Sequence, residues 1–409
     1  MKKTSEYKHL WVFPWSYRES FIFTSGLFLT GIVLEIISGG KGIIIPSFPY
    51  NLLILFGFIF FLIILHFFLN IHIKKWLNNI PAAIAAILSL FFLSVFMGFI
   101  PQKDIDNSFL TITGLTHIHR SWAFSLIFIF LLTVLGLTII KRLNSYKIRN
   151  IAFLLNHIGL FIILISAGLS SSDFKKFKMR LVEGQTINTV YDENNNFYNL
   201  NFGIRLSKFN IDEYEPQFLL INNKGEIINK KHKYYKKLKP GISLFINEFR
   251  IDIQKFFNAS VPFNSTFRPI DTIGAVFSAK VEIFDKKNKL LTKGWVSSKS
   301  IFDMMPKILN INKDIMLTLS LPAPKRFSSL ICINPDNNPL NIKLEVNKPY
   351  KYKNWKIYQT GYDENFGKWS KISFIELIQD KWISGFYFGT IMLFIGTLLL
   401  LFIGKKTIP

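Results

Sequence analysis

The sequence contains a single cysteine, Cys332, among its 409 residues. One cysteine cannot form an internal disulfide, and no Cys-x-x-Cys pair exists, so the chain is not a thiol oxidoreductase. No Ser/His/Asp arrangement, phosphate-binding glycine loop or carboxylate pair stands out either. These absences argue against a self-sufficient hydrolase or nucleotide enzyme, and we predict no catalytic residue. Acidic residues are also few, 26 against 49 lysines and arginines, which leaves a formal charge of +23.

Long hydrophobic runs, in contrast, are abundant. Half of the residues are hydrophobic and the mean hydropathy is +0.29, as expected for membrane spans combined with a water-facing domain. Six runs approach the roughly 20 residues that a bilayer requires, and they lie near 20–38, 51–69, 82–100, 122–140, 151–170 and 383–403. The sequence therefore predicts an integral membrane α-helical bundle with six spans.

The basic residues of the short connections predict how these spans are oriented. They gather in alternate connections, as Lys2, Lys3, Lys8, Lys74, Lys75, Lys141, Arg142, Lys147, Arg149, Lys405 and Lys406. Loops rich in lysine and arginine remain in the cytoplasm. Both termini are then expected inside and residues 171–381 outside. This topology predicts a multi-pass protein of the cell inner (cytoplasmic) membrane whose large domain is periplasmic.

The polar segment between the fifth and sixth spans has the periodicity of strands. Apolar residues from Phe277 to Ile283 alternate with polar ones, and a polar turn at 285–289 is followed by a second run that reaches Trp295. This pattern predicts a hairpin. We therefore expect five spans in 1–170, a β-rich extracytoplasmic domain in 171–381 folded as a sandwich or open barrel, and the last span with a short cytoplasmic tail in 382–409. The basic run 230–239 within this domain is interpreted as a solvated loop or an anion-binding patch, with no indication of nucleic-acid binding.

His157 is the strongest candidate for chemistry because it lies inside the fifth apolar run. An ionisable group at membrane depth is costly and usually has a partner and a function. Neutral imidazole is also a good ligand of haem iron. The alternative is a structural histidine that hydrogen-bonds a neighbouring helix. As a ligand, it would need a second imidazole from another helix or another protein.

Weaker candidates lie in two other places. His66, near the end of the second span, is either a ligand or a side chain that hydrogen-bonds a carbonyl. His117, His119 and Arg120 precede the fourth span, where a His-x-His pair is too small for a structural zinc site and the arginine suits a carboxylate. The alternative for this cluster is packing at the membrane interface. Glu35, near the end of the first span, is assigned no chemistry. We predict no metal other than haem iron.

Several segments resemble one family. These are the histidine-bearing span 155–159 followed by Gly168, the segment 179–185, the motif 345–363 with Asp380 after it, and His119 to Trp122. They resemble the ResB (CcsB) family of cytochrome c biogenesis proteins, and the opening motif 14–19 with two additional N-terminal spans resembles the form found in Bacteroidota. The family's membrane haem histidine maps onto His157 alone.

The resemblance implies a subunit of a System II cytochrome c assembly complex. Such proteins help to export haem and attach it to apocytochrome c together with a CcsA-type partner, whose tryptophan-rich haem motif is absent from this sequence. The implied role is therefore that of an accessory subunit of a membrane haem lyase (cytochrome c synthase), with no enzymatic activity alone. Haem b would bind transiently and be shared with the partner, within the lipid bilayer.

Two other functions compete with this interpretation. One is a membrane electron-transfer subunit with permanently bound b-type haem, for which His66 and His157 are the candidate pair. The other is a scaffold or sensor that binds no haem and whose outer domain binds a peptide.

Overall fold

The computed structural model describes residues 10–103, 105, 108–143, 147–228, 237–302, 305–321, 323–335 and 337–404. Most of the basic run 230–239 lies outside these residues. The chain divides into two compact units. We name Met1–Phe174 with Gln379–Pro409 the membrane unit, and Lys175–Ile378 the β-domain.

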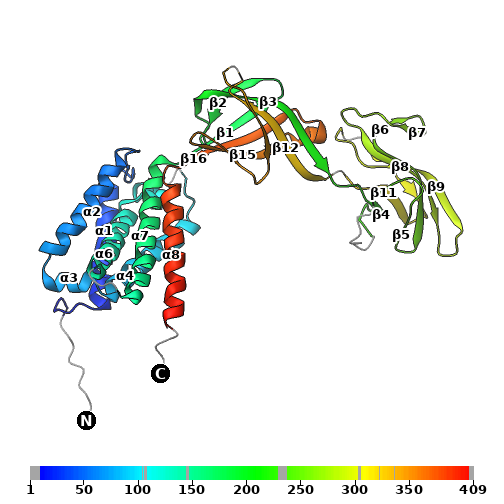
Figure 1. The fold of residues 1–409 in the computed structure, drawn as a ribbon. Coiled ribbons are helices and arrows are strands. Elements are labelled where there is room, and N and C mark those ends of the chain that lie inside the picture. The colour runs from blue at the N-terminus through cyan, green and yellow to red at the C-terminus, as the bar shows by residue number, and fades with distance from the viewer. Residues whose placement is uncertain are drawn as a thin grey trace, which may run out of the picture. The chain divides into compact units, whose positions relative to one another are not determined.

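Among the described residues, six helices are long and apolar enough to cross a membrane, which confirms the six predicted spans as helices. They are α1 (Tyr17–Ile37), α2 (Asn51–Phe68), α4 (Ile80–Phe99), α6 (Trp122–Arg142), α7 (Ile148–Asp173) and α8 (Ile383–Gly404), as Figure 1 shows. The chain is therefore a multi-pass membrane protein. Short helices α3 (Ile71–Leu77) and α5 (Ser108–Ile112) and the 3₁₀ helix η1 (Leu115–Arg120) lie in the connections.

Local sequence explains where the helices begin. Glu19 accepts a hydrogen bond from the backbone N–H of Ser16 at 2.8 Å and so closes the first turn of α1. Asn79 and Ser121 cap α4 and α6, where their side chains accept backbone N–H groups that would otherwise lack partners. A proline follows Asn79 in the first turn of α4, where its missing N–H costs nothing.

Hydrogen bonds between helices show which helix ends lie together. Trp76 of α3 donates to the Ser20 hydroxyl in the first turn of α1 at 2.8 Å. At the other end, Asp173 at the close of α7 accepts from Asn51 at the start of α2 and from Trp382 just before α8. The last turn of α2 therefore lies at the same end as the first turn of α7, and these two helices run in opposite directions. We name this the α3 end of the bundle.

Eight strands of the β-domain form one antiparallel, nearly closed barrel-like sheet in the order β13-β12-β3-β2-β1-β16-β15-β14. Their bounds are β1 (Lys175–Val182), β2 (Thr186–Tyr191), β3 (Phe197–Glu213), β12 (Pro324–Ile333), β13 (Leu340–Glu345), β14 (Tyr350–Tyr352), β15 (Trp355–Tyr362) and β16 (Ile372–Gln379). Alternate residues point inward and fill the interior, including Met179, Leu181, Ile204, Leu206, Ile331, Ile357 and Leu377. The interior of the barrel is therefore a packed hydrophobic core.

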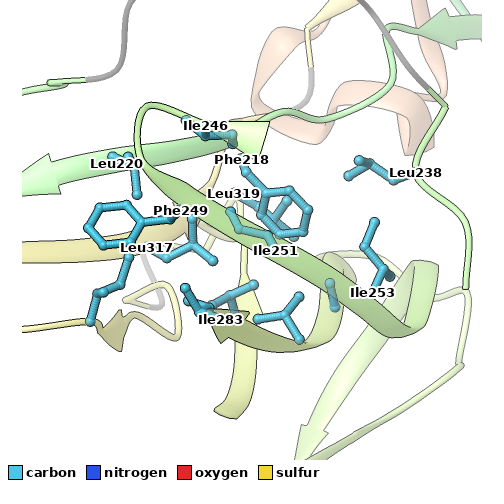
Figure 2. Packing of buried hydrophobic residues seen from close by; sticks show 14 of the residues in the cluster. Phe218, Leu220, Leu238, Ile246, Phe249, Ile251, Ile253, Ile283, Leu317 and Leu319 are labelled. Atoms are coloured by element: carbon cyan, nitrogen blue, oxygen red, sulfur yellow. The ribbon is translucent and has the colours of Figure 1, made fainter. Parts of the chain in front are cut away.

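The remaining strands form two facing sheets between β3 and β12. One contains β4 (Phe218–Asn222), β10 (Leu309–Asn310) and β11 (Ile315–Leu319), and the other β5 (Ser243–Ile246), β6 (Phe249–Phe263), β7 (Thr266–Arg268), β8 (Val276–Phe284) and β9 (Leu290–Ser297). Figure 2 shows their common core, where Phe218 and Leu317 meet Ile251 and Ile283. Both predicted architectures are therefore present, a small sandwich inserted into an open barrel.

The predicted hairpin at 277–295 is confirmed as β8 and β9. The two strands pair antiparallel, with Ile283 opposite Thr292. In the turn, the Asp285 carboxylate accepts the backbone N–H groups of Lys287 and Lys289 at 2.8 and 2.9 Å. An aspartate that bonds its own backbone two residues on is a strong turn former, so the polar loop 285–289 fixes this register.

Candidate functional site

His157 lies in the third turn of α7, half-buried, and its orientation is fixed by its own helix. Nδ1 is 2.9 Å from the carbonyl oxygen of Phe153, and the two rings stack with centroids 3.6 Å apart. A carbonyl oxygen only accepts, so in the neutral ring Nδ1 carries the proton and Nε2 carries the lone pair. A backbone carbonyl on one nitrogen and a free lone pair on the other is the usual arrangement of a metal-ligating histidine. No described residue hydrogen-bonds Nε2.

The opposite face of α7 packs closely against α8. A Cβ on Gly159 would lie 2.5 Å from the backbone nitrogen of Leu393, and one on Gly389 would lie 2.7 Å from the carbonyl oxygen of Gly159. One turn away, the Asn156 side chain donates to the Thr397 hydroxyl at 2.7 Å. Small residues that allow backbone contact are a common means of helix association in membranes. Gly159 therefore serves the α7–α8 interface, and His157 projects from a different face.

His66 lies in the last turn of α2 and its Nδ1 is buried without a hydrogen-bond partner. A buried polar atom without a partner carries a desolvation cost. The carbonyl oxygen of His66, by contrast, accepts from the Lys74 ammonium at 2.7 Å. The structure therefore gives the backbone of His66 a partner and leaves the ring nitrogen without one.

Gly136 of α6 shows that His66 and His157 lie at a similar depth. A Cβ on Gly136 would be 2.5 Å from Cδ1 of Leu62 on α2 and 3.4 Å from Cε2 of Phe161 on α7. His66 follows Leu62 by one turn and His157 precedes Phe161 by one turn. Since α2 and α7 run in opposite directions, both histidines are displaced from this contact toward the α3 end.

His117, His119 and Arg120 lie elsewhere, in η1 before the first turn of α6. His119 and Arg120 are exposed, and the carbonyl oxygen of Arg120 accepts from the backbone of Ile43 at 2.8 Å. About 14 residues of α6 separate η1 from Gly136, a distance of roughly 20 Å along the helix. These three residues therefore do not share a site with His157. Among the described residues, no group of three or more His, Cys, Asp or Glu side chains could hold a metal ion.

Two buried carboxylates hold helix ends together. Glu35 is 1% exposed and accepts from the backbone N–H groups of Gly42 and Trp122, both at 2.8 Å. Asp173, which the sequence analysis did not identify, is 3% exposed and accepts from Phe48 N, Asn51 Nδ2 and Trp382 Nε1 at 2.9, 2.7 and 2.8 Å. Both carboxylates are satisfied by donors, which makes them structural. The signal for Asp173 was an acidic residue that follows the fifth apolar run after only three serines.

The motif 345–363 contributes to the barrel sheet. Gln359 is buried and donates to the Gly361 carbonyl at 2.9 Å, at the bulge where β15 changes register against β16. It also donates to Ser373, which in turn is 2.8 Å from Ser329. Tyr362 stacks on Phe209 with centroids 5.2 Å apart. The most recognisable segment of the sequence is therefore engaged in packing and hydrogen bonding inside the domain.

Glu345, the first residue of this motif, forms an ion-pair cluster at the β13–β14 turn. Its two carboxylate oxygens each lie 2.8 Å from an ammonium group, one of Lys343 and one of Lys348. Hydrogen bonds and charge from Lys343 first, and from Lys348, lower the pKa of Glu345 to about 2. Exposed ion pairs contribute little to stability, so the cluster chiefly fixes the turn.

No family model matches the chain, and no curated protein matches it. Among solved structures, a cytochrome c heme lyase CcmF is similar at 9% identity and a TM-score of 0.27. The match covers 95% of this chain and 46% of that one, so the chain spans about half the length of this neighbour.

Proposed function

We propose that this chain is a haem-handling membrane subunit in cytochrome c assembly, with His157 as an axial ligand of haem iron. The observation that carries the proposal is the His157 ring itself. Its Nδ1 bonds the Phe153 carbonyl inside a membrane-spanning helix, which leaves Nε2 as a lone-pair donor. The same role is supported by resemblance to ResB proteins, which is found in segments 155–159, 179–185 and 345–363.

The residues of the membrane unit suit haem as a cargo. The macrocycle is apolar on its faces, and α2, α6 and α7 are apolar helices. Haem also carries two carboxylates, and the α3 end offers Lys74, Lys141 and Arg142 to meet them. Bound haem supplies the vinyl groups that a cytochrome's cysteines attack, and the chain contributes the ligand and the apolar surroundings. We assign covalent attachment to a CcsA-type partner and expect the β-domain to face apocytochrome c.

The orientation of the chain is part of this proposal. The α3 end carries Lys74, Lys75, Lys141 and Arg142, which favours the cytoplasm. The native Cys332 is 1% exposed, so labelling of the unmodified chain should be low. A membrane-impermeant thiol reagent on intact cells should label Lys286→Cys in the β-domain and leave Lys141→Cys unlabelled. The reverse pattern would place the β-domain in the cytoplasm and remove the role in periplasmic assembly.

His157→Ala tests the ligand. The amount of haem that co-purifies with the complex should fall, and the amount of holocytochrome c should fall with it. The amount of membrane-inserted chain should stay normal, because inserting alanine into a bilayer costs less free energy than inserting histidine. Added imidazole should partly restore both by filling the vacant coordination position. His72→Ala is the matched control, since His72 is exposed in α3. Unchanged haem and unchanged cytochrome would reduce His157 to a packing residue.

Retention of haem separates this function from electron transfer. A permanent b-type centre should keep its haem after purification without partner and during cytochrome synthesis. Haem that the chain only carries for cytochrome assembly should leave it when a CcsA-type partner and apocytochrome c are supplied. Haem that stays bound under those conditions would favour the electron-transfer function.

A further inference from the structure

Aromatic side chains gather at one end of the barrel sheet, where β1 and β15 begin and β2 turns into β3. Phe177 of β1 lies between Tyr198 and Trp355, with ring centroids 4.9 and 5.5 Å apart. Across the β2–β3 turn, Tyr191 is paired with Phe197, and their rings are 6.4 Å apart. We name these five residues the aromatic rim of the β-domain.

The outer members of the aromatic rim are exposed although they belong to a paired strand. Phe197 is 75% exposed and Tyr198 is 44% exposed. The Tyr198 hydroxyl donates to the Asp192 carboxylate at 3.2 Å, so its polar tip is held within the turn while part of the ring remains uncovered. Aromatic rings that combine apolar surface with a polar tip are enriched where a membrane meets water.

The strand ends that carry the aromatic rim are also rich in lysine. Segments 175–178, 191–198 and 353–356 contain Lys175, Lys176, Lys178, Lys353 and Lys356. Their two carboxylates are engaged: Glu193 pairs with Lys176 at 3.4 Å, and Asp192 accepts backbone N–H groups of its own turn. The net charge of this end is therefore positive, which complements the phosphates of anionic lipids.

The covalent chain keeps this end of the barrel near a bilayer. Helix α7 ends at Asp173 and β1 begins at Lys175, so Phe174 alone separates a membrane span from the strand that carries Phe177. A fully extended residue spans at most about 3.6 Å, which holds Lys175 within roughly 7 Å of the end of that span. The headgroup region on each side of a bilayer is itself roughly 5–8 Å thick. The start of β1 is therefore within reach of the headgroups.

We propose that the aromatic rim binds the surface of the lipid bilayer. Phe197 and Tyr198 insert among the headgroups, and the lysines of the same strand ends contact lipid phosphates. The inference goes beyond the proposed function and does not depend on haem binding or on which side of the membrane holds the β-domain. It gives the turn 353–356, part of the motif that resembles ResB proteins, a position at the membrane surface.

Spin labels on the full-length chain test this proposal. The chain is reconstituted into vesicles of phosphatidylethanolamine and phosphatidylglycerol and labelled at Phe197→Cys. The control is Phe245→Cys, which is similarly exposed at 72% but lies in β5 of the sandwich. Native Cys332 is 1% exposed and should take little label. Oxygen dissolves in lipid and a nickel chelate stays in water. We expect several-fold fewer collisions with the chelate at 197 than at 245, and at least as many with oxygen.

Two outcomes would overturn the proposal. Equal access of the chelate to the two positions would mean that the rim lies in water. Protection of position 197 from both oxygen and chelate would mean that protein covers the rim, whether a second copy or another segment. Neither result would affect the proposed function, because no haem is involved.

A charge reversal tests the lysine contacts separately. Lys175 is exposed at the first position of β1. In the Phe197→Cys background, Lys175→Glu should raise chelate access at position 197 in the anionic vesicles and leave it unchanged in vesicles of phosphatidylcholine alone. An unchanged circular dichroism spectrum would show that the variant is folded. A folded variant with unchanged chelate access in the anionic vesicles would refute the contacts between the lysines and lipid phosphates.

Discussion

The membrane unit and the β-domain use their polar side chains in different ways. In the β-domain, the motif 345–363 is engaged in the sheet, where Gln359 satisfies a bulge and Glu345 fixes a turn. In the membrane unit, polar groups are few. Some of them join separate helices, as Asp173 does. His66 and His157 each keep one ring nitrogen that no described residue hydrogen-bonds. The most recognisable segment of this sequence therefore specifies the fold, while the candidate ligand residues are isolated histidines of the membrane helices.

Asp173→Ala should be the most damaging change, because Asp173 joins three separate segments of the membrane unit. It leaves Phe48 N, Asn51 Nδ2 and Trp382 Nε1 without their acceptor. A buried donor left unpaired costs about 1–3 kcal/mol. The Asn51 bond is buried and the other two are partly buried, so the membrane unit should lose roughly 3 kcal/mol. The yield of monodisperse chain in detergent should fall steeply. Asp173→Asn retains one acceptor and should be milder; equal yields of wild type and Asp173→Ala would contradict the structural role.

Trp355→Ala tests whether the β-domain motif serves the fold alone. Trp355 is half-buried and packs against Phe177 with ring centroids 5.5 Å apart. Full truncation of a buried aromatic costs roughly 3–5 kcal/mol, so a half-buried one should cost about 2 kcal/mol and lower the protein level. Haem bound per folded chain should not change. Normal abundance together with lost cytochrome assembly would contradict a purely structural role, because the motif would then have a docking function.

Gly389→Ala should have a smaller effect that is confined to the α7–α8 contact. The new Cβ would lie 2.7 Å from the carbonyl oxygen of Gly159 and 3.0 Å from Ile163. Overpacking of this kind costs about 1–3 kcal/mol, and the melting temperature of the purified chain should fall. Gly57→Ala is the matched control, because nothing lies within 4 Å of its added Cβ. Similar melting temperatures for the two variants would show that α7 and α8 separate easily.

The sequence predicted the fold well where its signals are local. Apolar run length predicted six helices, and alternation predicted the hairpin of β8 and β9. The insertion of a sandwich between β3 and β12 was not predictable, because Phe209 and Ser329 pair although more than 100 residues separate them in the sequence, and no local pattern indicates such a pairing. Sequence marked both His66 and His157 as unusual. Their similar depth in the helix bundle is known only from the contacts around Gly136. Nothing in the sequence near Gly136 indicates those contacts.

The smallest expected effect is the pH dependence of the β-domain, which contrasts two glutamates. Burial, with a contribution from Asp271, raises the pKa of Glu213, although Lys368 opposes the shift. A raised folded pKa means that the folded state holds its proton more tightly, so stability is lost as pH rises from the ordinary glutamate value of about 4.3. Glu345 has the opposite sign: its lowered pKa gives stability above that value, which is lost as pH falls toward about 2.

Replacing each glutamate by glutamine should therefore shift stability in opposite directions at neutral pH. Glu213→Gln removes a carboxylate that is penalised by burial, and the β-sheet signal in circular dichroism should melt at a higher temperature. Because the side chain is half-exposed and screened, we expect a gain of no more than about 2 °C. The gain should disappear near pH 4, where the wild-type carboxyl is protonated. Glu345→Gln should melt lower at pH 7 and match the wild type near pH 2. A gain for Glu213→Gln that persists unchanged at pH 4 would assign the effect to packing instead of to the charge.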